Sequence, residues 1–255
     1  MAADLDRAHA TSWAPDAAGE IYERGRPDYP DAAGAVLAEH LALGPGTRVA
    51  DVAAGTGKLT GLLVDVAATP VMAVEPMAGM RSQLARRAGG ISVVAAGAEH
   101  LPLATGSLDA VTVAQAFHWF DVPQASAELA RVLRTGGRLA LVTNRPHHTT
   151  TWQADLWSTL RRYETVAPRP ASSSGWRQAL DATGDFRVFR RFEIPHEQRF
   201  ATRDDFDARF ASISHVMLLD HGTRQELFDE LRAIVAGHEP VVIALTTVIE
   251  IASVA

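Results

Sequence analysis

Five short runs of Val, Ala, Leu and Ile recur between residues 48 and 144, with helix-like segments among them. The runs do not alternate apolar with polar residues, so each predicts a strand buried on both faces, as in a parallel sheet. Strands that alternate with helices at this spacing predict a doubly wound α/β sheet. The runs are RVADVAA (48–54), VMAVE (71–75), ISVVAA (91–96), LDAVTVA (108–114) and GRLALVTN (137–144).

Two further strands are expected late in the chain, FRVFRRFEIPHEQRF (186–200) and the β-branched PVVIALTTVIEIAS (240–253). We expect both to complete the first sheet, while the helices between them roof its carboxyl edge. Helices are expected over 31–43, 57–67, 77–88, 123–134, 152–164, 203–219 and 223–236.

These patterns divide the chain into an N-terminal arm (1–30), a core (31–145), and a third part (146–255) that holds a helical cap and the last two strands. A Pro- and Ser-rich break, APRPASSSG (167–175), interrupts the third part. We find no internal repeat and no second core large enough to stand alone.

Composition excludes several classes of function. The net charge is −6, from 24 Lys and Arg against 30 Asp and Glu, whereas a general nucleic-acid binder needs a basic face. The chain has no cysteine, which removes disulfides, thiolate metal ligands and a thiol nucleophile. His147 and His148 are adjacent, so their side chains do not share a face and make a poor metal site. We therefore expect no metal and no nucleic-acid partner.

No segment predicts a signal peptide or a membrane span. The first ten residues, MAADLDRAHA, lack an apolar run. The longest apolar segment, PVVIALTTVIEIASVA (240–255), is too short to span a bilayer and contains Glu250. We expect a cytoplasmic protein without a membrane partner. No pattern predicts the oligomeric state.

The segment VADVAAGTGKLT (49–60) places an Asp, a glycine pair and the start of a helix directly after the first strand. Ligands of open α/β sheets bind at this edge, against backbone N–H groups and a helix N-terminus. Gly55 and Gly57 permit positive φ and close approach of a ligand. A phosphate-binding P-loop is excluded, because Val52 stands where its first glycine belongs and Leu59 where a hydroxyl would bind Mg²⁺.

A dinucleotide motif, G-x-G-x-x-G, is matched only in part. Gly55 and Gly57 occupy its first two positions, but Thr60 falls at the third and Gly61 comes one residue late. S-adenosylmethionine is the remaining class of ligand, and it carries no phosphate. Its ribose hydroxyls can both donate to one carboxylate at the end of the second strand, and Glu75 in VMAVEP has this place.

Four segments in register resemble the successive motifs of class I S-adenosylmethionine-dependent methyltransferases, over about residues 47–144. They are VADVAAGTGKLT, VMAVEPMAGM, AAGAEHLPLATGSLDAVTVAQAFHWFD and ELARVLRTGGRLALVT. The arm YERGRPDYP and the segment AFHWF are similar, more narrowly, to small-molecule methyltransferases related to trans-aconitate methyltransferase. The resemblance implies a Rossmann-like seven-stranded sheet, mostly parallel, with an antiparallel last strand.

The resemblance also implies roles for single positions. Asp51, Gly55 and Gly57 would hold the methionine end of S-adenosylmethionine, and Glu75, followed by Pro76, would hold the ribose. Met77 would pack on the adenine, and Ala98 and Glu99 would form the turn beside the adenine amino group. Ala114 and Gln115 would end the fourth strand under the sulfonium.

Ala53 departs from the family pattern, which usually has the first glycine of the loop at this position. A methyl group there would narrow the space beside the methionine backbone. Because alanine has the smallest side chain after glycine, we expect the cofactor still to bind.

Two residues, His118 and Tyr22, are candidates for the chemistry itself. Methyl transfer from a sulfonium is an in-line displacement, and a base matters only where the acceptor must lose a proton. His118 can take a proton near neutral pH, or it can belong to an aromatic plug made by FHWF. Tyr22 and Arg26 lie in an arm that, by resemblance, folds over the cofactor. Arg26 would pair with the cofactor carboxylate or with an acidic acceptor, or it is an ordinary surface arginine.

The sequence thus predicts a methyltransferase acting on a small organic acceptor through oxygen, nitrogen or carbon. The Ala- and Arg-rich composition indicates a high-GC bacterial source, and on that ground we expect a natural-product intermediate as the acceptor. Three alternatives stay open: a fold that binds the cofactor but steers a ring closure, a non-catalytic scaffold, and an oxidoreductase with a nicotinamide cofactor.

Overall fold

A computed structural model describes residues 16–67, 70–87, 89, 91–148, 150–164 and 175–255. Within these ranges the chain forms one seven-stranded sheet in the order β3-β2-β1-β4-β5-β7-β6. Strands β1 to β5 pair in parallel, whereas β7 runs antiparallel to both β5 and β6. The predicted doubly wound sheet with a reversed last strand is confirmed. The strands are β1 (Val49–Val52), β2 (Val71–Val74), β3 (Ile91–Val94), β4 (Leu108–Ala114), β5 (Leu133–Pro146), β6 (Phe186–Arg199) and β7 (Val242–Val254).

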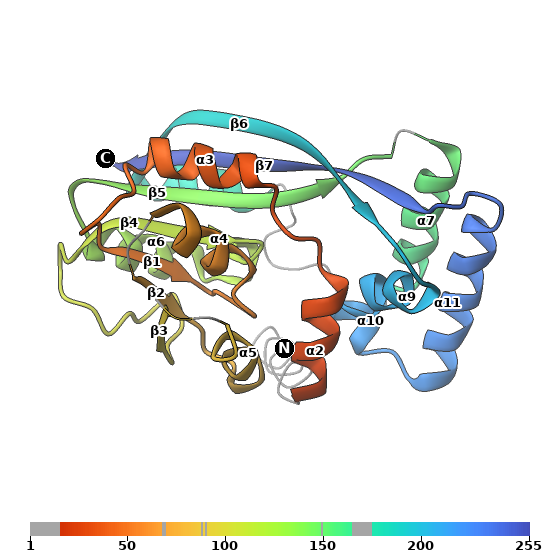
Figure 1. Ribbon diagram of the computed structural model, residues 1–255. Helices are drawn as coiled ribbons and strands as arrows, with labels where there is room; N and C mark the ends of the chain where they lie inside the picture. The colour runs from red at the N-terminus through yellow and green to blue at the C-terminus, as the bar shows by residue number, and fades with distance from the viewer. Residues whose placement is uncertain (1–15, 68–69, 88, 90, 149, 165–174) are drawn as a thin grey trace.

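Helices cover both faces of the sheet, and a separate group of helices forms a cap at one end (Figure 1). The long strands β6 and β7 extend beyond the ends of the inner strands and lead to this cap, which consists of α7, α9, α10 and α11. The helices are α2 (Asp16–Gly25), α3 (Asp31–His40), α4 (Lys58–Ala67), α5 (Ala78–Leu84), α6 (Val122–Val132), α7 (Thr151–Arg162), α8 (Gly175–Thr183), α9 (Arg203–Ala211), α10 (Ser214–Met217) and α11 (His221–Val235), with a 3₁₀ turn η1 at Phe117–Trp119.

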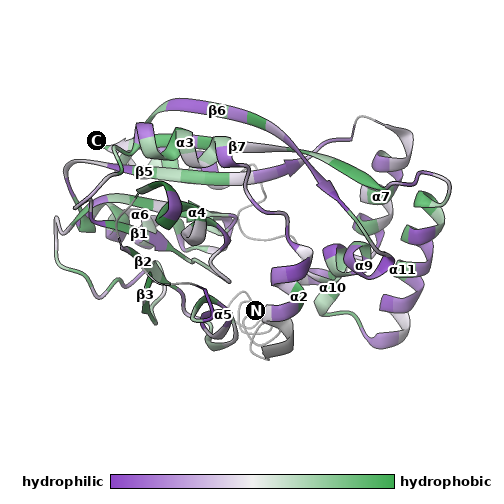
Figure 2. Cartoon of the chain, viewed as in Figure 1, coloured by the Kyte–Doolittle hydropathy of each residue, from purple (hydrophilic) through white to green (hydrophobic). Residues whose placement is uncertain are grey.

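The sheet is buried because apolar side chains cover both of its faces. Leu129 of α6 and Leu180 of α8 belong to the core on one face, and Leu37 of α3 and Leu63 of α4 to the core on the other. All four side chains are completely buried. Figure 2 shows the hydrophobic inner strands beside the more hydrophilic edge strand β6, most of whose residues are partly or fully exposed. The burial pattern explains why the inner strands lack alternation in the sequence.

The cap has a core of its own, built from α7, α9, α10, α11 and the start of β7. Leu156, Phe210, Leu227 and Ile243 are fully buried in it. Two of these helices begin at side-chain caps. Thr202 and Asp205 form a reciprocal capping box at α9, and Asp220 accepts the N–H of Thr223 at α11.

Several boundaries differ from the sequence prediction. Helix α8 was not expected, because its short apolar stripe follows directly on the Pro- and Ser-rich break. Residues 16–25 of the arm form helix α2, and the expected helix 203–219 is divided between α9 and α10. Strand β5 begins at Leu133, where a helix was expected to finish, and it runs past residue 145. The division into three parts therefore stays a prediction. Residues 1–15 of the arm and 167–174 of the break lie outside the described residues.

Candidate functional site

A pocket of about 440 Å³ lies at the carboxyl ends of β1, β2 and β4, and α2 and α10 contribute to its wall. It brings together all of the predicted site residues except Asp51 and Gly57. The predicted residues that line it are Tyr22, Arg26, Ala53, Gly55, Glu75, Pro76, Met77, Ala98, Glu99, Ala114, Gln115 and His118. Their binding and catalytic roles remain predictions, but their convergence on one cavity is a property of the fold.

Glu75 follows β2 and is only 4% exposed. Its Oε2 accepts the backbone N–H of Gly55, and its Oε1 accepts that of Met77, both at 2.9 Å. Burial raises the pKa of Glu75, and the two N–H donors and the charge of Arg81 oppose part of that rise. The carboxylate is therefore held in one orientation at the pocket wall, and each oxygen retains a lone pair for a ligand hydroxyl.

The loop after β1 has positive φ at three positions: Ala53 (55°), Gly55 (59°) and Gly57 (83°). A Cβ at Gly55 would meet nothing closer than Tyr22 Cε1, at 4.0 Å, so glycine leaves this part of the pocket wide. A Cβ at Gly57 would instead lie 2.3 Å from Leu84 Cδ1 of α5. Gly57 therefore lets α4 begin close against α5, and it does not line the pocket.

Ala53 and Gln115 are non-glycine residues in the left-handed region, and both line the pocket. Gln115 ends β4 with φ 57°, and its Nε2 donates to the carbonyl of Asn144 at 3.2 Å. Left-handed backbone is costly for residues with a Cβ, and such strain is concentrated at functional sites. At Ala53 the cost of left-handed backbone gives a second physical reason why the family prefers glycine. The first reason, expected from the sequence, is that a methyl group narrows the space beside the methionine backbone.

Asp51 lies beneath the loop and is completely buried. Its carboxylate accepts the hydroxyls of Thr60 on α4, at 2.6 Å, and Thr112 on β4, at 2.7 Å. Burial raises the pKa of Asp51 to about 6, and the two hydroxyl donors oppose part of that rise. Asp51 thus ties β1 to its neighbours and acts on the pocket through the loop that it supports.

Sulfur-containing side chains form an apolar wall at the side of the pocket predicted for adenine. Met77, Met80, Tyr22 and Met217 pack together, with Met217 contributed by α10 of the cap. Ala98 and Glu99 also line the pocket, and Glu99 accepts the backbone N–H of Asp121 at 3.1 Å. Thioether side chains such as these make favourable contacts with aromatic rings.

The segment FHWF serves both as core and as pocket wall. Phe117 is buried, and its ring lies 5.4 Å from the rings of Phe120 and Trp176. His118 and Trp119 line the pocket, with their rings 5.1 Å apart. His118 also lines a neighbouring cavity of about 490 Å³, at the ends of β4 and β5. It therefore lies at the junction of two cavities, where a donor and an acceptor can meet.

Helix α2 connects the pocket to the cap. It packs against both α5 and α9, so the arm lies between the sheet and the cap helices (Figure 1). Arg26 directly follows α2. Its guanidinium carbon lies 5.2 Å from the Tyr22 ring centroid, and its Nη2 donates to the carbonyl of Ser212 at 2.8 Å. The structure thus places both predicted arm residues at the pocket.

Four lining residues were missed by the sequence analysis. Met80 was within reach of it, because it lies three residues after Met77, a spacing that places two residues on the same side of a helix. Ser214 was not, because nothing in the segment DARFASISHVM indicates that α10 turns toward the sheet. The missed residues are Met80, Gly97, Ala116 and Ser214, whereas Trp119 and Phe120 belong to the FHWF segment that was named as an aromatic plug.

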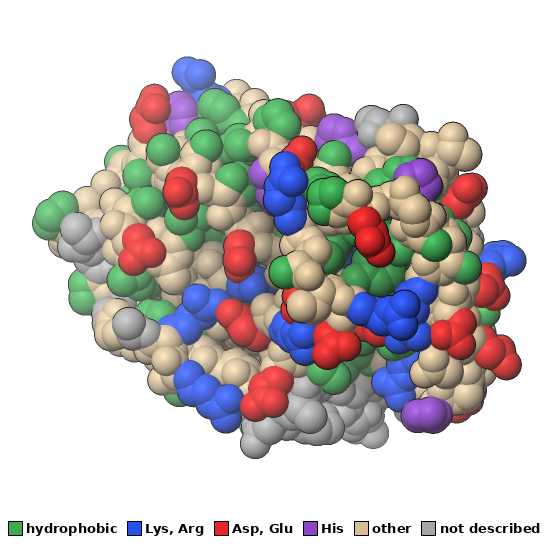
Figure 3. Space-filling view, turned by 45° about the vertical axis from the view of Figure 1, so that its right-hand side comes forward, with side chains coloured by type: hydrophobic (Ala, Val, Ile, Leu, Met, Phe, Trp, Pro, Cys, Tyr) green, Lys and Arg blue, Asp and Glu red, His purple; other side chains and the backbone are tan. Residues whose placement is uncertain are grey.

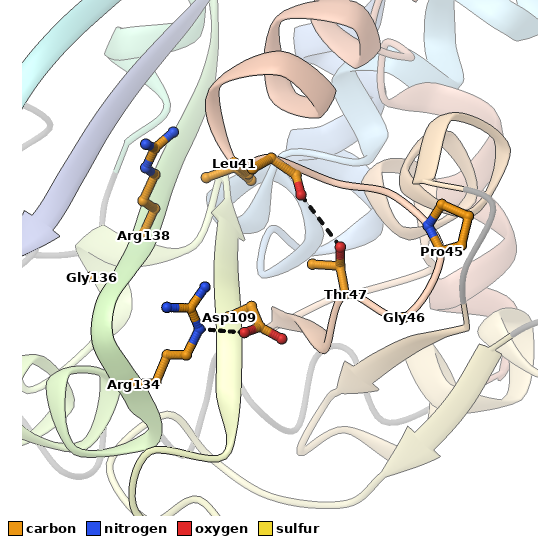
Figure 4. Close-up of a pocket in the computed structure, with 9 residues that line it drawn as sticks. Leu41, Pro45, Gly46, Thr47, Asp109, Arg134, Gly136 and Arg138 are labelled. Carbon is orange, nitrogen blue, oxygen red and sulfur yellow. Dashed lines mark hydrogen bonds and ion pairs between the residues drawn. The ribbon is translucent and has the colours of Figure 1, made fainter.

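A second hollow, of about 310 Å³, lies at the opposite edge of the sheet (Figure 4). Its charged side chains have partners within the fold: Asp109 pairs with Arg134 and accepts Arg48 Nε at 2.9 Å. Arg138 donates to the carbonyl of His40. These pairs join the starts of β1, β4 and β5, and we assign this hollow to the structure of the sheet.

Charged residues of both signs are interspersed over the face shown in Figure 3, with no large area of one sign. Among the described residues, no three His, Asp or Glu side chains come together as a metal site. No helix in the described ranges has the length and apolar character that crossing a membrane requires.

Comparison with known proteins agrees with this geometry. A family model described as a methyltransferase domain matches residues 50–141. Uncharacterized methyltransferases of Mycobacterium tuberculosis and Mycobacterium bovis are 43% identical to the chain, over 85% of its length and 83% of theirs. The chain belongs to the class I methyltransferases.

This methyltransferase is also similar to solved structures. A protein of Anaeromyxobacter dehalogenans described as a type II methyltransferase matches with a TM-score of 0.68 and 27% identity, over 89% of this chain and 97% of that one. The [4+2]-cyclase SpnF matches with a TM-score of 0.54 and 18% identity, over 90% and 83%. The second likeness shows the fold alone, and the reaction of this methyltransferase must be argued from its pocket.

Proposed function

We propose that this methyltransferase takes its methyl group from S-adenosylmethionine and transfers it to a small organic acceptor. The orientation of Glu75 carries the proposal. Gly55 and Met77 hold its two oxygens, and the carboxylate lies in the wall of a pocket wide enough for a nucleoside. A fixed, buried carboxylate is suited to two neighbouring hydroxyls, as on a ribose.

Other contacts argue against a phosphate ligand. Lys58, the only lysine near the glycine loop, pairs with Asp28 at 2.7 Å and approaches Glu23 at 3.8 Å. No cation balances the carboxylate of Glu75 by direct ion pairing in the described part of the chain. At Glu75 and the glycine loop the pocket wall is negative and has no free lysine, which disfavours a pyrophosphate at that place and favours a nucleoside that carries positive charge.

The pocket residues divide the proposed cofactor among them. Glu75 would hold the ribose, Met77 and Met80 would contact the adenine, and Gly55 would face the methionine part. When bound, S-adenosylmethionine supplies a methyl group on a positively charged sulfur. The apolar side chains at the end of β4 and in the FHWF segment exclude water from that side and orient the acceptor.

His118 is the proposed proton acceptor for an acceptor hydroxyl or amine. It lies at the junction of the two cavities, and an imidazole ring is the side chain that most often accepts a proton in general-base catalysis. Tyr22 is the second candidate, because it reaches the pocket from the opposite wall, beside Gly55. Both roles are proposals that the family membership alone does not assign.

Two measurements test the proposed function. Thermal-shift assays with S-adenosylmethionine, S-adenosylhomocysteine and NADH should show a higher Tm with the two sulfur compounds and no shift with NADH. Incubation with methyl-labelled S-adenosylmethionine and a small-molecule extract should then give labelled product and S-adenosylhomocysteine. A shift with NADH alone would refute the proposal. Binding of S-adenosylmethionine with an unmethylated, rearranged product would favour the ring-closure alternative.

A further inference from the structure

Arg209 on α9 is 5% exposed and takes part in no ion pair among the described residues. Its guanidinium carbon lies 5.5 Å from the ring centroid of Trp157 on α7 and 6.0 Å from that of Phe210. Its Nε and Nη1 are buried and have no hydrogen-bond partner in the described structure. A buried cation without a counter-charge is costly, so this arginine requires an explanation.

Two further donors in the same region are also unsatisfied. Arg26 Nε and Trp157 Nε1 are buried, and the residues that the structure describes give neither of them a hydrogen-bond partner. The backbone around Ser212 joins the two arginines: Arg26 Nη2 donates to the Ser212 carbonyl at 2.8 Å, and Ser212 Oγ donates to the Arg209 carbonyl at 2.7 Å. We call these donors, on Arg26, Arg209 and Trp157, the donor cluster. It offers buried N–H groups that no acceptor within the described ranges satisfies.

Packing of α2 on α9 holds the donor cluster in place. A Cβ at Gly25 would lie 2.0 Å from the carbonyl oxygen of Ala208, so the helices touch at the residues that directly precede Arg26 and Arg209. Burial, together with the positive charge of Arg26, lowers the pKa of Arg209 to about 9. Two like charges held together by the fold create a standing attraction for an anion.

Stacking on an aromatic ring does not by itself explain why Arg209 has no carboxylate partner among the described residues. Arg232 in the same cap also lies over an aromatic ring, 5.9 Å from the centroid of Phe228. Yet Arg232 pairs with both Asp207 and Asp229. Of these two ring-stacked cap arginines, only Arg209 lacks a carboxylate.

The donor cluster adjoins the pocket of the proposed reaction. Arg26 lines that pocket, and so does Ser214, five residues after Arg209. An anion bound by the cluster would therefore lie next to the wall of the pocket in which the acceptor is proposed to lie.

We propose that Arg209, Arg26 and Trp157 bind a carboxylate of the acceptor, so that the substrate class is a small organic acid. This inference rests on the proposed function. The carboxylate is a handle that orients the molecule, and the methylated atom is another group of it. Guanidinium forks match the two oxygens of a carboxylate, and a singly charged planar anion is less costly to bury between aromatic rings than a phosphate dianion.

Thermal-shift titrations with sodium malonate and sodium acetate test the proposal, against sodium chloride at equal ionic strength and with and without saturating S-adenosylhomocysteine. The wild-type chain should gain Tm with the carboxylates beyond the chloride control, by about 2–4 °C for each kcal/mol of linked binding free energy. Arg209→Met should lose this gain, whereas the matched control Arg232→Met should retain it. If Arg209→Met does not fold, Arg209→Lys decides, because it should keep only part of the gain.

Several results would overturn the proposal: equal carboxylate gains in wild type and in the Arg209 variants, no gain beyond chloride in wild type, or a gain with inorganic phosphate in place of malonate. A weaker affinity of Arg209→Met for S-adenosylhomocysteine, with unchanged affinity for methylthioadenosine, would assign the cluster to the cofactor carboxylate instead. Failure of the wild type to bind S-adenosylhomocysteine would refute the proposed function separately, because the malonate titration without it still reports on the cluster.

Discussion

The backbone N–H of Gly55 donates to Glu75 Oε2 across 2.9 Å, and this bond joins the loop after β1 to the end of β2. It explains why a carboxylate that is 4% exposed keeps a fixed orientation in the pocket wall. The loop and the carboxylate are therefore one unit, and changing either should alter binding of a nucleoside.

Glu75→Gln should weaken binding of S-adenosylhomocysteine about 10- to 100-fold, since a charged acceptor of two hydroxyls becomes a neutral amide with one acceptor oxygen. Isothermal titration calorimetry measures the change. Glu99→Gln is the matched control, because Glu99 lines the same pocket. The loss of affinity for S-adenosylhomocysteine in this variant should be much smaller. Equal affinities for wild type and Glu75→Gln would contradict the assignment of the ribose site.

Ala53→Gly should stabilise the protein by about 0.5–1 kcal/mol, because release of left-handed strain at φ 55° exceeds the entropy cost of a glycine. Ala54→Gly is the control. Ala54 has no positive φ among the described residues, so its change to glycine should destabilise the protein. Denaturation by urea at constant pH compares the two variants. Destabilisation by both would show that Ala53 bears no strain.

Asp51→Asn should gain stability relative to wild type as pH rises. The folded-state pKa of Asp51 is about 6, above its unfolded value, so the folded chain binds the proton more tightly and loses stability as pH rises from about 4 to about 6. The asparagine variant lacks this loss, and the difference should grow by up to about 3 kcal/mol over that window.

Guanidinium denaturation at several pH values measures this difference. Asp109→Asn is the control, because Arg48 and Arg134 hold the pKa of Asp109 below its ordinary value. The ionised Asp109 carboxylate loses its stabilising effect only as pH falls below about 4. The difference in free energy of unfolding between Asp109→Asn and wild type should therefore stay constant from about pH 5 to 7. A flat profile for Asp51→Asn as well would mean that Asp51 is not an ionised buried group.

His118→Phe should lower the rate of labelled-methyl incorporation by roughly 100-fold with little change in KM, if the acceptor loses a proton to the imidazole. Phenylalanine preserves an aromatic wall, so this variant separates proton transfer from the plug. Trp119→Phe is the control and should retain most of the rate. A wild-type rate in His118→Phe would contradict proton transfer by His118 and would leave the FHWF segment with a packing role alone.

The sheet could be predicted from the sequence because its strands are buried on both faces and read as continuous apolar runs. The pocket could be predicted because Gly55 and Glu75 belong to motifs whose spacing follows from strand ends that meet at one edge. Asp51 belongs to the same motif, but its carboxylate binds the hydroxyls of Thr60 and Thr112 below the loop and does not line the pocket. This orientation could not be predicted, because the two hydroxyls lie nine and 61 residues away in the sequence.

The cap side of the site could not be predicted in this way. Arg209 and Ser214 reach the pocket region only because Gly25 lets α2 and α9 touch, which is a long-range packing event without a local motif. Positive φ at Ala53 and Gln115 is equally hidden, because neither residue type signals left-handed backbone.

A crystal structure with S-adenosylhomocysteine tests the central claim most directly. We predict that both ribose hydroxyls lie within about 3 Å of the Glu75 carboxylate oxygens, with the adenine between Met77 and the turn at Ala98. A ribose bound away from Glu75, or a pocket that takes up NADH and leaves S-adenosylhomocysteine in solution, would contradict the account.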